Sequence, residues 1–157
     1  MKTERNVYMM SHSPIKLRIP AEADYLDIVR AALYAIAAKA GFPYEDIEDM
    51  KVAVTEACSN AILHAYKGND DRGEVDVEFM CLEDGLTMTV RDYGGAREER
   101  PEPIRTTGLQ GTPISDAPIG GLGLFMMRAL MDEVKVRVNN GTEVVLTKRM
   151  SRNEEMV

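Results

Sequence analysis

The chain has 157 residues, of which 45% are hydrophobic and 29% charged, and this suits a single globular domain. Its net charge of −7 argues against direct nucleic-acid binding, because a nucleic-acid surface needs clustered lysine and arginine. Residues 1–13 lack a signal peptide's apolar segment, no apolar run is long enough to span a bilayer, and the two cysteines show neither metal-site nor disulfide spacing. We therefore expect one cytoplasmic domain over residues 1–157, with an ordered core at about 15–149 and no membrane contact.

The first part of the chain predicts one strand and two helices. Residues 15–19 alternate apolar and polar side chains, which is typical of a strand with one buried face. A helical repeat follows at 24–39, with Asp24 as the expected N-cap and Gly41 as the expected C-terminal stop. The second predicted helix, 44–66, begins with acidic residues and is followed by lysine and glycine, the charge order that a helix dipole favours.

The rest of the chain predicts strands joined by hairpins, with one more helix between them. Strands are expected at 74–82, 86–91, 134–138 and 143–147, and a buried helix at 125–131. Residues 96–119 carry several prolines and no period, so they are either a lid or binding segment or a disordered loop. This order predicts a two-layer α/β sandwich, with helices on one face of a mainly antiparallel mixed sheet.

The second predicted helix carries an unusual polar stripe. Glu56, Asn60 and His64 fall at i, i+4 and i+8, so they project from one side, while apolar residues gather on the opposite side. One interpretation is an ordinary solvated face. The other is a ligand site, because burying such groups is costly unless they meet a ligand or water.

Two glycine motifs favour the ligand site. An acid at a strand end is followed by glycine at 92–94, and a Gly-x-Gly sequence opens the last helix at 121–123. Alone, the first is most often a turn and the second a helix start. Together with Glu56 and Asn60 they fit a nucleotide: glycines at a helix N-terminus admit phosphate, and an amide oxygen can ligate Mg²⁺. One carboxylate can accept a hydrogen bond from the adenine amine, and another can activate a hydroxyl.

The ordered set resembles the GHKL (Bergerat-fold) ATP-binding domain of histidine kinases and type II topoisomerases. The resemblance is closer to the anti-sigma factor serine kinases of the RsbW/SpoIIAB family, over about residues 15–148. It depends on the runs at 55–61 and 64–66, on 120–124 followed by 130–134, and on 146–148. It implies the Bergerat fold, ATP and Mg²⁺ as cofactors, and residues 96–119 as an ATP lid.

The resemblance also implies roles for single residues. Glu56 would be the general base or orient the incoming serine, Asn60 would ligate Mg²⁺, and Asp92 would bind the adenine amine. The remaining nucleotide contacts would come from glycines, from the lid and from the last strand: Gly94, Gly121, Leu122, Gly123, Leu124, Arg105, Thr106, Thr107 and Thr147. Arg30, by default a solvated charge, matches a first-helix arginine that contacts protein partners.

Three functions remain open at this point. The resemblance implies a homodimeric kinase that sequesters a sigma-B type sigma factor and phosphorylates a serine of its anti-anti-sigma antagonist. The first alternative is a non-catalytic, nucleotide-dependent anti-sigma binding module, and the second is an ATPase detached from a larger machine. The chain departs from the family at 117–119, where relatives carry a charged residue, and this puts the lid contacts in question.

Overall fold

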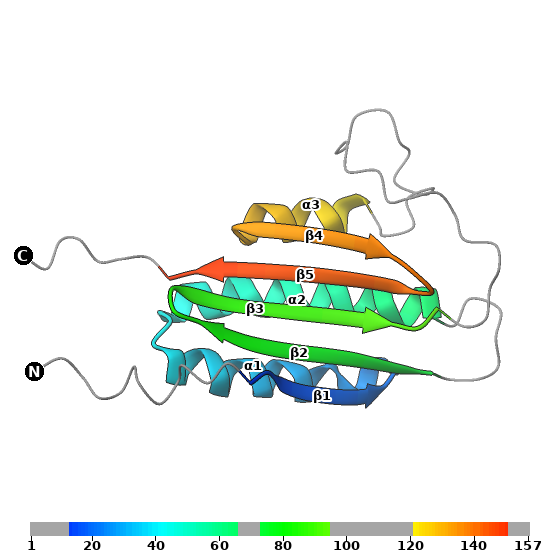
Figure 1. Cartoon of the computed structure of the whole chain (residues 1–157), viewed down its shortest axis with the longest axis horizontal. Helices are drawn as coiled ribbons and strands as arrows, with labels where there is room; N and C mark the ends of the chain where they lie inside the picture. Colours follow the sequence, from blue (N-terminus) through cyan, green and yellow to red (C-terminus); the bar gives the residue numbers. More distant parts are fainter. Residues whose placement is uncertain (1–12, 66–72, 95–120, 151–157) are drawn as a thin grey trace, which may run out of the picture.

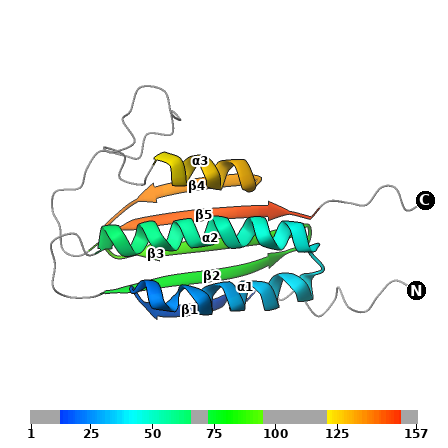
Figure 2. The same ribbon diagram turned by 180° about the vertical axis from the view of Figure 1, so that it is seen from behind.

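The sheet is a single antiparallel layer with its helices on one side (Figures 1 and 2). The computed structural model describes residues 13–65, 73–94 and 121–150. Its five strands are β1 (Ile15–Pro20), β2 (Glu74–Leu82), β3 (Gly85–Asp92), β4 (Glu133–Val138) and β5 (Thr142–Arg149), in the spatial order β1-β2-β3-β5-β4.

The helices are a short 3-10 turn η1 (Ala23–Tyr25), α1 (Leu26–Ala40), α2 (Tyr44–Ala65) and α3 (Gly121–Leu130). Figure 2 shows α2 between α1 and α3, over the middle of the sheet. No helix in the described part of the chain is both long and apolar enough to cross a bilayer.

The predicted two-layer α/β sandwich is confirmed, and every predicted strand and helix is present. The last helix is not buried as expected: α3 packs through Gly123, Leu124 and Met127, and Phe125 on its other side is 52% exposed. All four strand pairings among the described residues are antiparallel, so the mixed pairing that we expected is not found there. Asp24 does not cap α1: it lies inside η1, and the residue before α1 is Tyr25, which makes no side-chain capping bond. Gly41 does end α1, in the left-handed conformation that glycine adopts readily.

Helix α2 is the centre of the core because its apolar side is almost completely buried. The sequence places seven apolar residues on that side, and six of them have exposed fractions of 4% or less: Ile47, Met50, Val54, Ala57, Cys58 and Ala61. The seventh, Ala65, is the last residue of α2, and its side chain lies outside the described ones. They join one buried cluster with the inward-facing residues of β2, β3 and β5. The polar stripe of α2 is therefore held in a fixed direction by the packing of the opposite side.

The far end of α3 is fixed by a lysine of β5. Lys148 Nζ donates a hydrogen bond of 2.6 Å to the carbonyl oxygen of Leu130, the last residue of α3. The same nitrogen lies 3.5 Å from Asp49 Oδ2 of α2. A cation at a helix C-terminus is favourable, because the last carbonyl groups have no partner inside the helix. Lys148 thus ties α3, α2 and β5 together at one point.

The buried thiol of Cys58 gives a test of this packing. Burial raises its pKa to about 12, whereas Cys81 is only partly buried and its pKa is also raised by burial. Because the thiolate is the reactive form, we expect Cys58 to resist Ellman's reagent at pH 8 until the chain unfolds. An unfolded thiol ionises near pH 8.5, whereas Cys58 in the folded chain keeps its proton up to about pH 12. The unfolded state therefore loses this proton first, and the free energy of unfolding should fall as the pH rises between these two values.

The measurement is the rate at which Ellman's reagent labels Cys58 in the Cys81→Ser protein. Labelling should be slow in the native state and become rapid only after unfolding in guanidinium chloride. The Cys58→Ser protein is the matched control, and its Cys81 should react first in the native state. Rapid labelling of native Cys81→Ser would contradict the burial of this side of α2.

Candidate functional site

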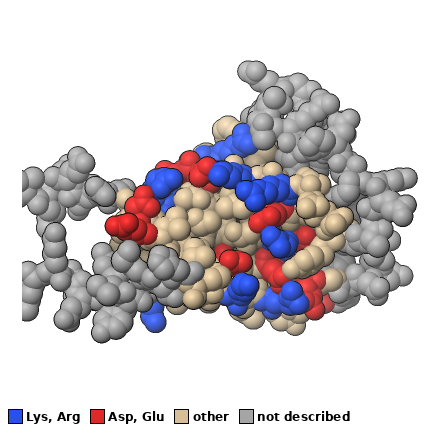
Figure 3. Space-filling view, viewed as in Figure 1, with Lys and Arg blue, Asp and Glu red and all other residues tan. Residues whose placement is uncertain are grey.

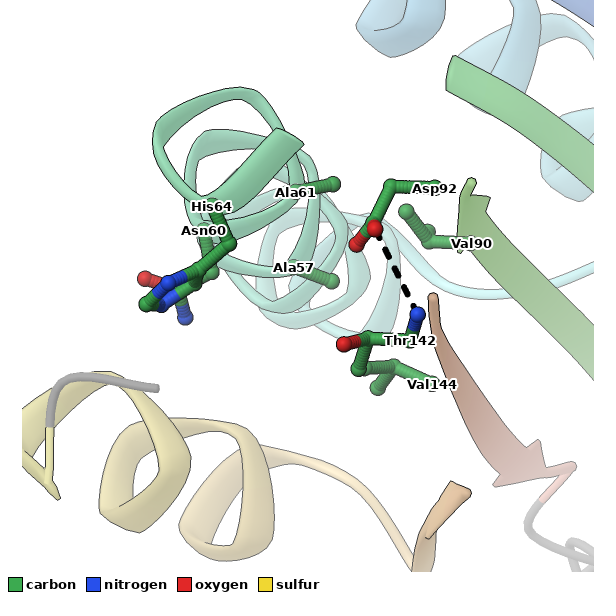
Figure 4. A pocket seen from close by; sticks show the side chains of 8 residues that line it. All are labelled: Ala57, Asn60, Ala61, His64, Val90, Asp92, Thr142 and Val144. Atoms are coloured by element: carbon green, nitrogen blue, oxygen red, sulfur yellow. Dashed lines mark hydrogen bonds between the residues drawn. The ribbon is translucent and has the colours of Figure 1, made fainter. Parts of the chain in front are cut away.

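A small pocket lies between α2 and the adjacent ends of β3 and β5 (Figure 4). In this view along α2, Ala57 and Ala61 face the strands, whereas Asn60 and His64 project toward α3. The lining residues come from all three elements: Ala57, Asn60, Ala61, His64, Val90, Asp92, Thr142 and Val144. The two alanines leave space between the helix and the strands because they carry no side chain beyond Cβ.

The polar stripe of α2 is not a solvated outer face. Asn60 is only 8% exposed, and Glu56 and His64 are both partly buried. In the part of the chain that the structure describes, Asn60 Nδ2 is buried and has no hydrogen-bond partner. A buried polar atom without a partner costs about 1–3 kcal/mol, so this amide favours a ligand that completes its contacts.

The first turn of α3 lies directly against this stripe. A Cβ atom added to Gly123 would lie 3.0 Å from Glu56 Oε2 and 3.3 Å from Asn60 Nδ2. Glycine therefore allows the backbone of α3 to approach both side chains closely. The first N–H groups of a helix have no partner inside it and attract anions, so the turn at 121–123 presents a phosphate-binding end beside an acid and an amide.

Asp92 lies at the opposite side of the pocket, on the last residue of β3. It is 3% exposed, and its Oδ1 accepts a hydrogen bond of 3.3 Å from the backbone N–H of Thr142. A carboxylate has about four acceptor positions, so it can accept further donors such as an exocyclic amine. The pocket thus has an acceptor at one side and a helix N-terminus at the other.

Two glycines bring the end of β3 against the hairpin between β4 and β5. Gly94 has φ +62°, and a Cβ added there would lie 3.0 Å from the Cα atom of Gly141. A Cβ added to Gly141 would overlap the carbonyl oxygen of Asp92. These positions need glycine because two backbones meet there, and this contact holds the end of β3, with Asp92, against the β4–β5 hairpin.

The structure does not bring Thr147 to this pocket. Thr147 pairs in register with Thr87, and the two hydroxyl oxygens are 3.3 Å apart. Both lie on the open face of the sheet, the one opposite the helices, because the neighbouring Leu86, Met88 and Leu146 point into the core. Thr147 is nevertheless only 6% exposed there. Thr142, which the sequence did not single out, lines the pocket instead. Its signal was the Asn-Asn-Gly hairpin directly before it, which places it opposite Asp92 in the β3–β5 pairing.

The other predicted contacts divide into backbone positions and residues outside the described range. Leu122 is 58% exposed and Leu124 is buried in the core, and an apolar side chain offers phosphate no hydrogen bond, so these positions can bind phosphate only through their backbone N–H groups. Gly121 is the first residue of α3. The predicted lid at 96–119 lies outside the described residues, and so do Arg105, Thr106 and Thr107.

Arg30 of α1 is held against α2. Its Nε donates a hydrogen bond of 3.0 Å to the hydroxyl oxygen of Thr55, the residue before Glu56. Arg30 is partly buried, and Tyr34, one turn later on the same side of α1, is 49% exposed. The guanidinium is therefore fixed on a surface close to the polar stripe, which differs from a freely solvated charge.

The residues of the pocket fit a Mg²⁺–nucleotide complex in their chemistry. The amide of Asn60 offers oxygen, the ligand that Mg²⁺ prefers. Among the described residues no three His, Cys, Asp or Glu side chains are grouped to hold a metal ion. An ion beside Asn60 would then take its other ligands from phosphate and water, which is the usual arrangement for Mg²⁺.

Comparisons with known proteins show the family to which the chain belongs. A family profile described as "Histidine kinase-like ATPase domain" matches residues 19–148, from β1 to β5. Serine-protein kinase RsbW of Bacillus pumilus is 43% identical over 144 residues, covering 88% of this chain and 86% of its own. Serine-protein kinase RsbW of Listeria monocytogenes serotype 4a is 42% identical and covers 91% of both chains. The chain belongs to the RsbW family of serine-protein kinases.

One solved structure extends this family relationship. The crystal structure of the RsbU and RsbW domains of Rv1364c from Mycobacterium tuberculosis superposes with a TM-score of 0.63 at 25% identity. The alignment covers 89% of this chain and 33% of the mycobacterial chain, so the match is to one part of a longer protein. The α/β sandwich and its GHKL-type ATPase fold are therefore those of an RsbW-type domain.

In this RsbW-family chain, Gly123→Ala should separate stability from nucleotide binding. The new methyl group would crowd Glu56 Oε2 and Asn60 Nδ2, so we expect ATP affinity to fall at least about tenfold, with little loss of melting temperature. The matched control is Gly41→Ala, at φ +95° with no heavy atom within 4 Å. That change should cost about 1 kcal/mol of stability and leave affinity unchanged. Calorimetric titration with Mg-ATP and thermal unfolding measure both, and wild-type affinity in Gly123→Ala would contradict the close approach of α3.

Proposed function

We propose that the protein is an ATP-dependent serine kinase and anti-sigma factor. It sequesters a sigma-B type sigma factor as a homodimer and phosphorylates a serine of the anti-anti-sigma antagonist of that factor. The observation that carries the kinase part is the convergence of Glu56 Oε2 and Asn60 Nδ2 on the position of Gly123. A carboxylate, an amide and a phosphate-binding helix end are the parts that phosphoryl transfer to a hydroxyl needs.

In this proposal each side chain has one task. Asp92 accepts a hydrogen bond from the adenine amine, and Thr142 supports that carboxylate through its backbone N–H. The N–H groups at 121–124 hold the phosphates, with Arg105, Thr106 and Thr107 of the 96–119 lid on the outer phosphates. Asn60 ligates Mg²⁺, and the bound Mg-ATP supplies the phosphoryl group and an ion that neutralises its charge.

Glu56 acts on the acceptor serine. The serine hydroxyl oxygen bonds to the γ-phosphorus while the bond from that phosphorus to the β,γ-bridging oxygen breaks, and ADP leaves. Glu56 orients the hydroxyl and accepts its proton. A carboxylate is suited to this role because it only accepts hydrogen bonds when ionised and so aligns an O–H group.

Arg30 supports the anti-sigma part of the proposal. Its guanidinium is held by Thr55 one residue before Glu56, so one partner surface can include both α1 and the mouth of the site. Arginine is favoured at binding hot spots because it combines charge, a planar donor group and apolar area.

Glu56→Gln should abolish phosphoryl transfer while keeping nucleotide binding, because the amide keeps the shape of the side chain and loses the base. We expect transfer from Mg-ATP to the anti-anti-sigma serine to slow by about 100-fold or more. Incorporation of labelled phosphate measures the rate, and calorimetric titration measures ATP affinity. The exposed Glu133→Gln is the matched control and should transfer at the wild-type rate.

Transfer at the wild-type rate by Glu56→Gln would remove the assigned base. If the wild-type protein bound its sigma factor tightly and transferred nothing, the non-catalytic binding module would replace the kinase.

Arg30→Ala should weaken binding of the sigma factor at least about tenfold, because a hot-spot arginine contributes about 2 kcal/mol or more. ATP affinity should stay within twofold, since Arg30 does not line the pocket. The exposed Lys39→Ala, on the last turn of the same helix, is the control for lost charge. Equal sigma-factor affinities of Arg30→Ala and Lys39→Ala would contradict the role of Arg30.

A further inference from the structure

The last residues of β3 place neighbouring side chains on opposite faces of the sheet. Asp92 points toward α2 and is 3% exposed, whereas Tyr93 is 49% exposed and lies against the open face. Asp92 is also the last β3 residue in both ladders, with Val75 and Thr142 as its partners. Beyond it, the chain at 93–94 is not part of a strand, so its direction depends on other contacts.

Tyr93 is anchored by two neighbouring strands. Its hydroxyl donates a hydrogen bond to Asp76 Oδ2 of β2. Arg18 of β1 donates to both oxygens of the same carboxylate, from Nε to Oδ1 at 2.6 Å and from Nη2 to Oδ2 at 2.9 Å. Arg18 Nε also lies 3.1 Å from Glu74 Oε2. Figure 3 shows acidic and basic side chains interspersed over this face of the molecule.

The geometry of this cluster is suited to fixing the direction of the Tyr93 side chain, rather than only to adding stability. Single exposed ion pairs contribute little, because water screens both charges. Here one carboxylate receives a two-point arginine contact and a phenol, and such bidentate, linked contacts define a direction as well as a distance. Arg18 holds the pKa of Asp76 below its usual range, and the bond to Asp76 raises the pKa of Tyr93. At neutral pH the acceptor is therefore ionised and the donor protonated.

We infer that Arg18, Asp76 and Tyr93 form a latch that positions the nucleotide-binding turn at 92–94. The latch thereby sets how well Asp92 is placed to accept a hydrogen bond from the adenine amine. Tyr93 is a positioning residue, because it lies between Asp92 and Gly94 and acts from the other face of the sheet. The latch rests on the proposed role of Asp92 in base recognition. Residues on the open face of the sheet would thus contribute to base recognition, although the pocket lies on the face that the helices cover.

The test is base selectivity, measured as the ratio of Mg-ATP to Mg-GTP affinity by calorimetric titration and competition. GTP carries a carbonyl oxygen at position 6 of the base, where ATP has the amino group that would donate a hydrogen bond to Asp92. Tyr93→Phe and Arg18→Gln should each reduce the ATP preference about fivefold, the typical effect of one lost hydrogen bond. The double variant should lose no more than about the larger single effect, because both changes act through Asp76.

The matched control is Arg149→Gln, which breaks a similar exposed pair with Asp84, 3.0 Å apart, at the opposite end of β3. Its selectivity should equal that of the wild type. If it falls as far as Tyr93→Phe, the effect is general loosening and the latch is overturned.

Asp92→Asn distinguishes the latch from the site itself. If Asp92→Asn loses the ATP preference while Tyr93→Phe and Arg18→Gln keep it, the latch is overturned and the base-recognition proposal stands. If Asp92→Asn keeps the preference, both are overturned. Loss of preference in all three, with Arg149→Gln unchanged, supports the latch.

Discussion

The close approach of α3 to α2 is the constraint on which the site depends. A phosphate-binding helix end is useful here only if an acid and an amide lie within reach of the same phosphates, and Glu56 and Asn60 satisfy this because residue 123 has no side chain. Any larger residue would need the helices to separate or the two polar groups to turn away. The rest of the fold holds this distance: the apolar side of α2 is buried in the core, and Lys148 fixes the other end of α3.

This arrangement places function and stability in opposition along one helix. The apolar side of α2 is among the most completely buried surfaces in the described chain, whereas Asn60, on the other side, has a buried amide nitrogen with no partner there. Leaving such a group unpaired costs about 1–3 kcal/mol, a noticeable part of the 5–15 kcal/mol that stabilises a typical domain. The core side offsets this cost, so the binding side can remain prepared for its ligand.

Much of the fold and part of the site could be predicted from the sequence. Periodicity and turn chemistry predicted every strand and helix, because each has a regular pattern and most are bounded by glycine, proline or asparagine. Glu56 and Asn60 were found because helical spacing fixes their direction, and their proximity to Gly123 is a packing result that spacing only suggests. The choice of Thr147 rather than Thr142 shows the limit: they are an odd number of positions apart and so face opposite sides of β5, and only the register with β3 shows which side holds Asp92. The contacts of Arg18, Asp76 and Tyr93 depend on three aligned strands, which no local pattern encodes.

The tie between Lys148 and the last carbonyl of α3 has a mechanical consequence. With one end fixed, the helix can respond to a load at the other end mainly by tilting about that point, in the manner of a lever. Its 10 residues span about 15 Å, so a tilt of about 5° would carry the glycine end through about 1 Å. That displacement is enough to lengthen a hydrogen bond beyond its useful range. A small force at the glycine end would therefore be amplified where the polar groups of α2 meet the helix, while the anchored end hardly moves.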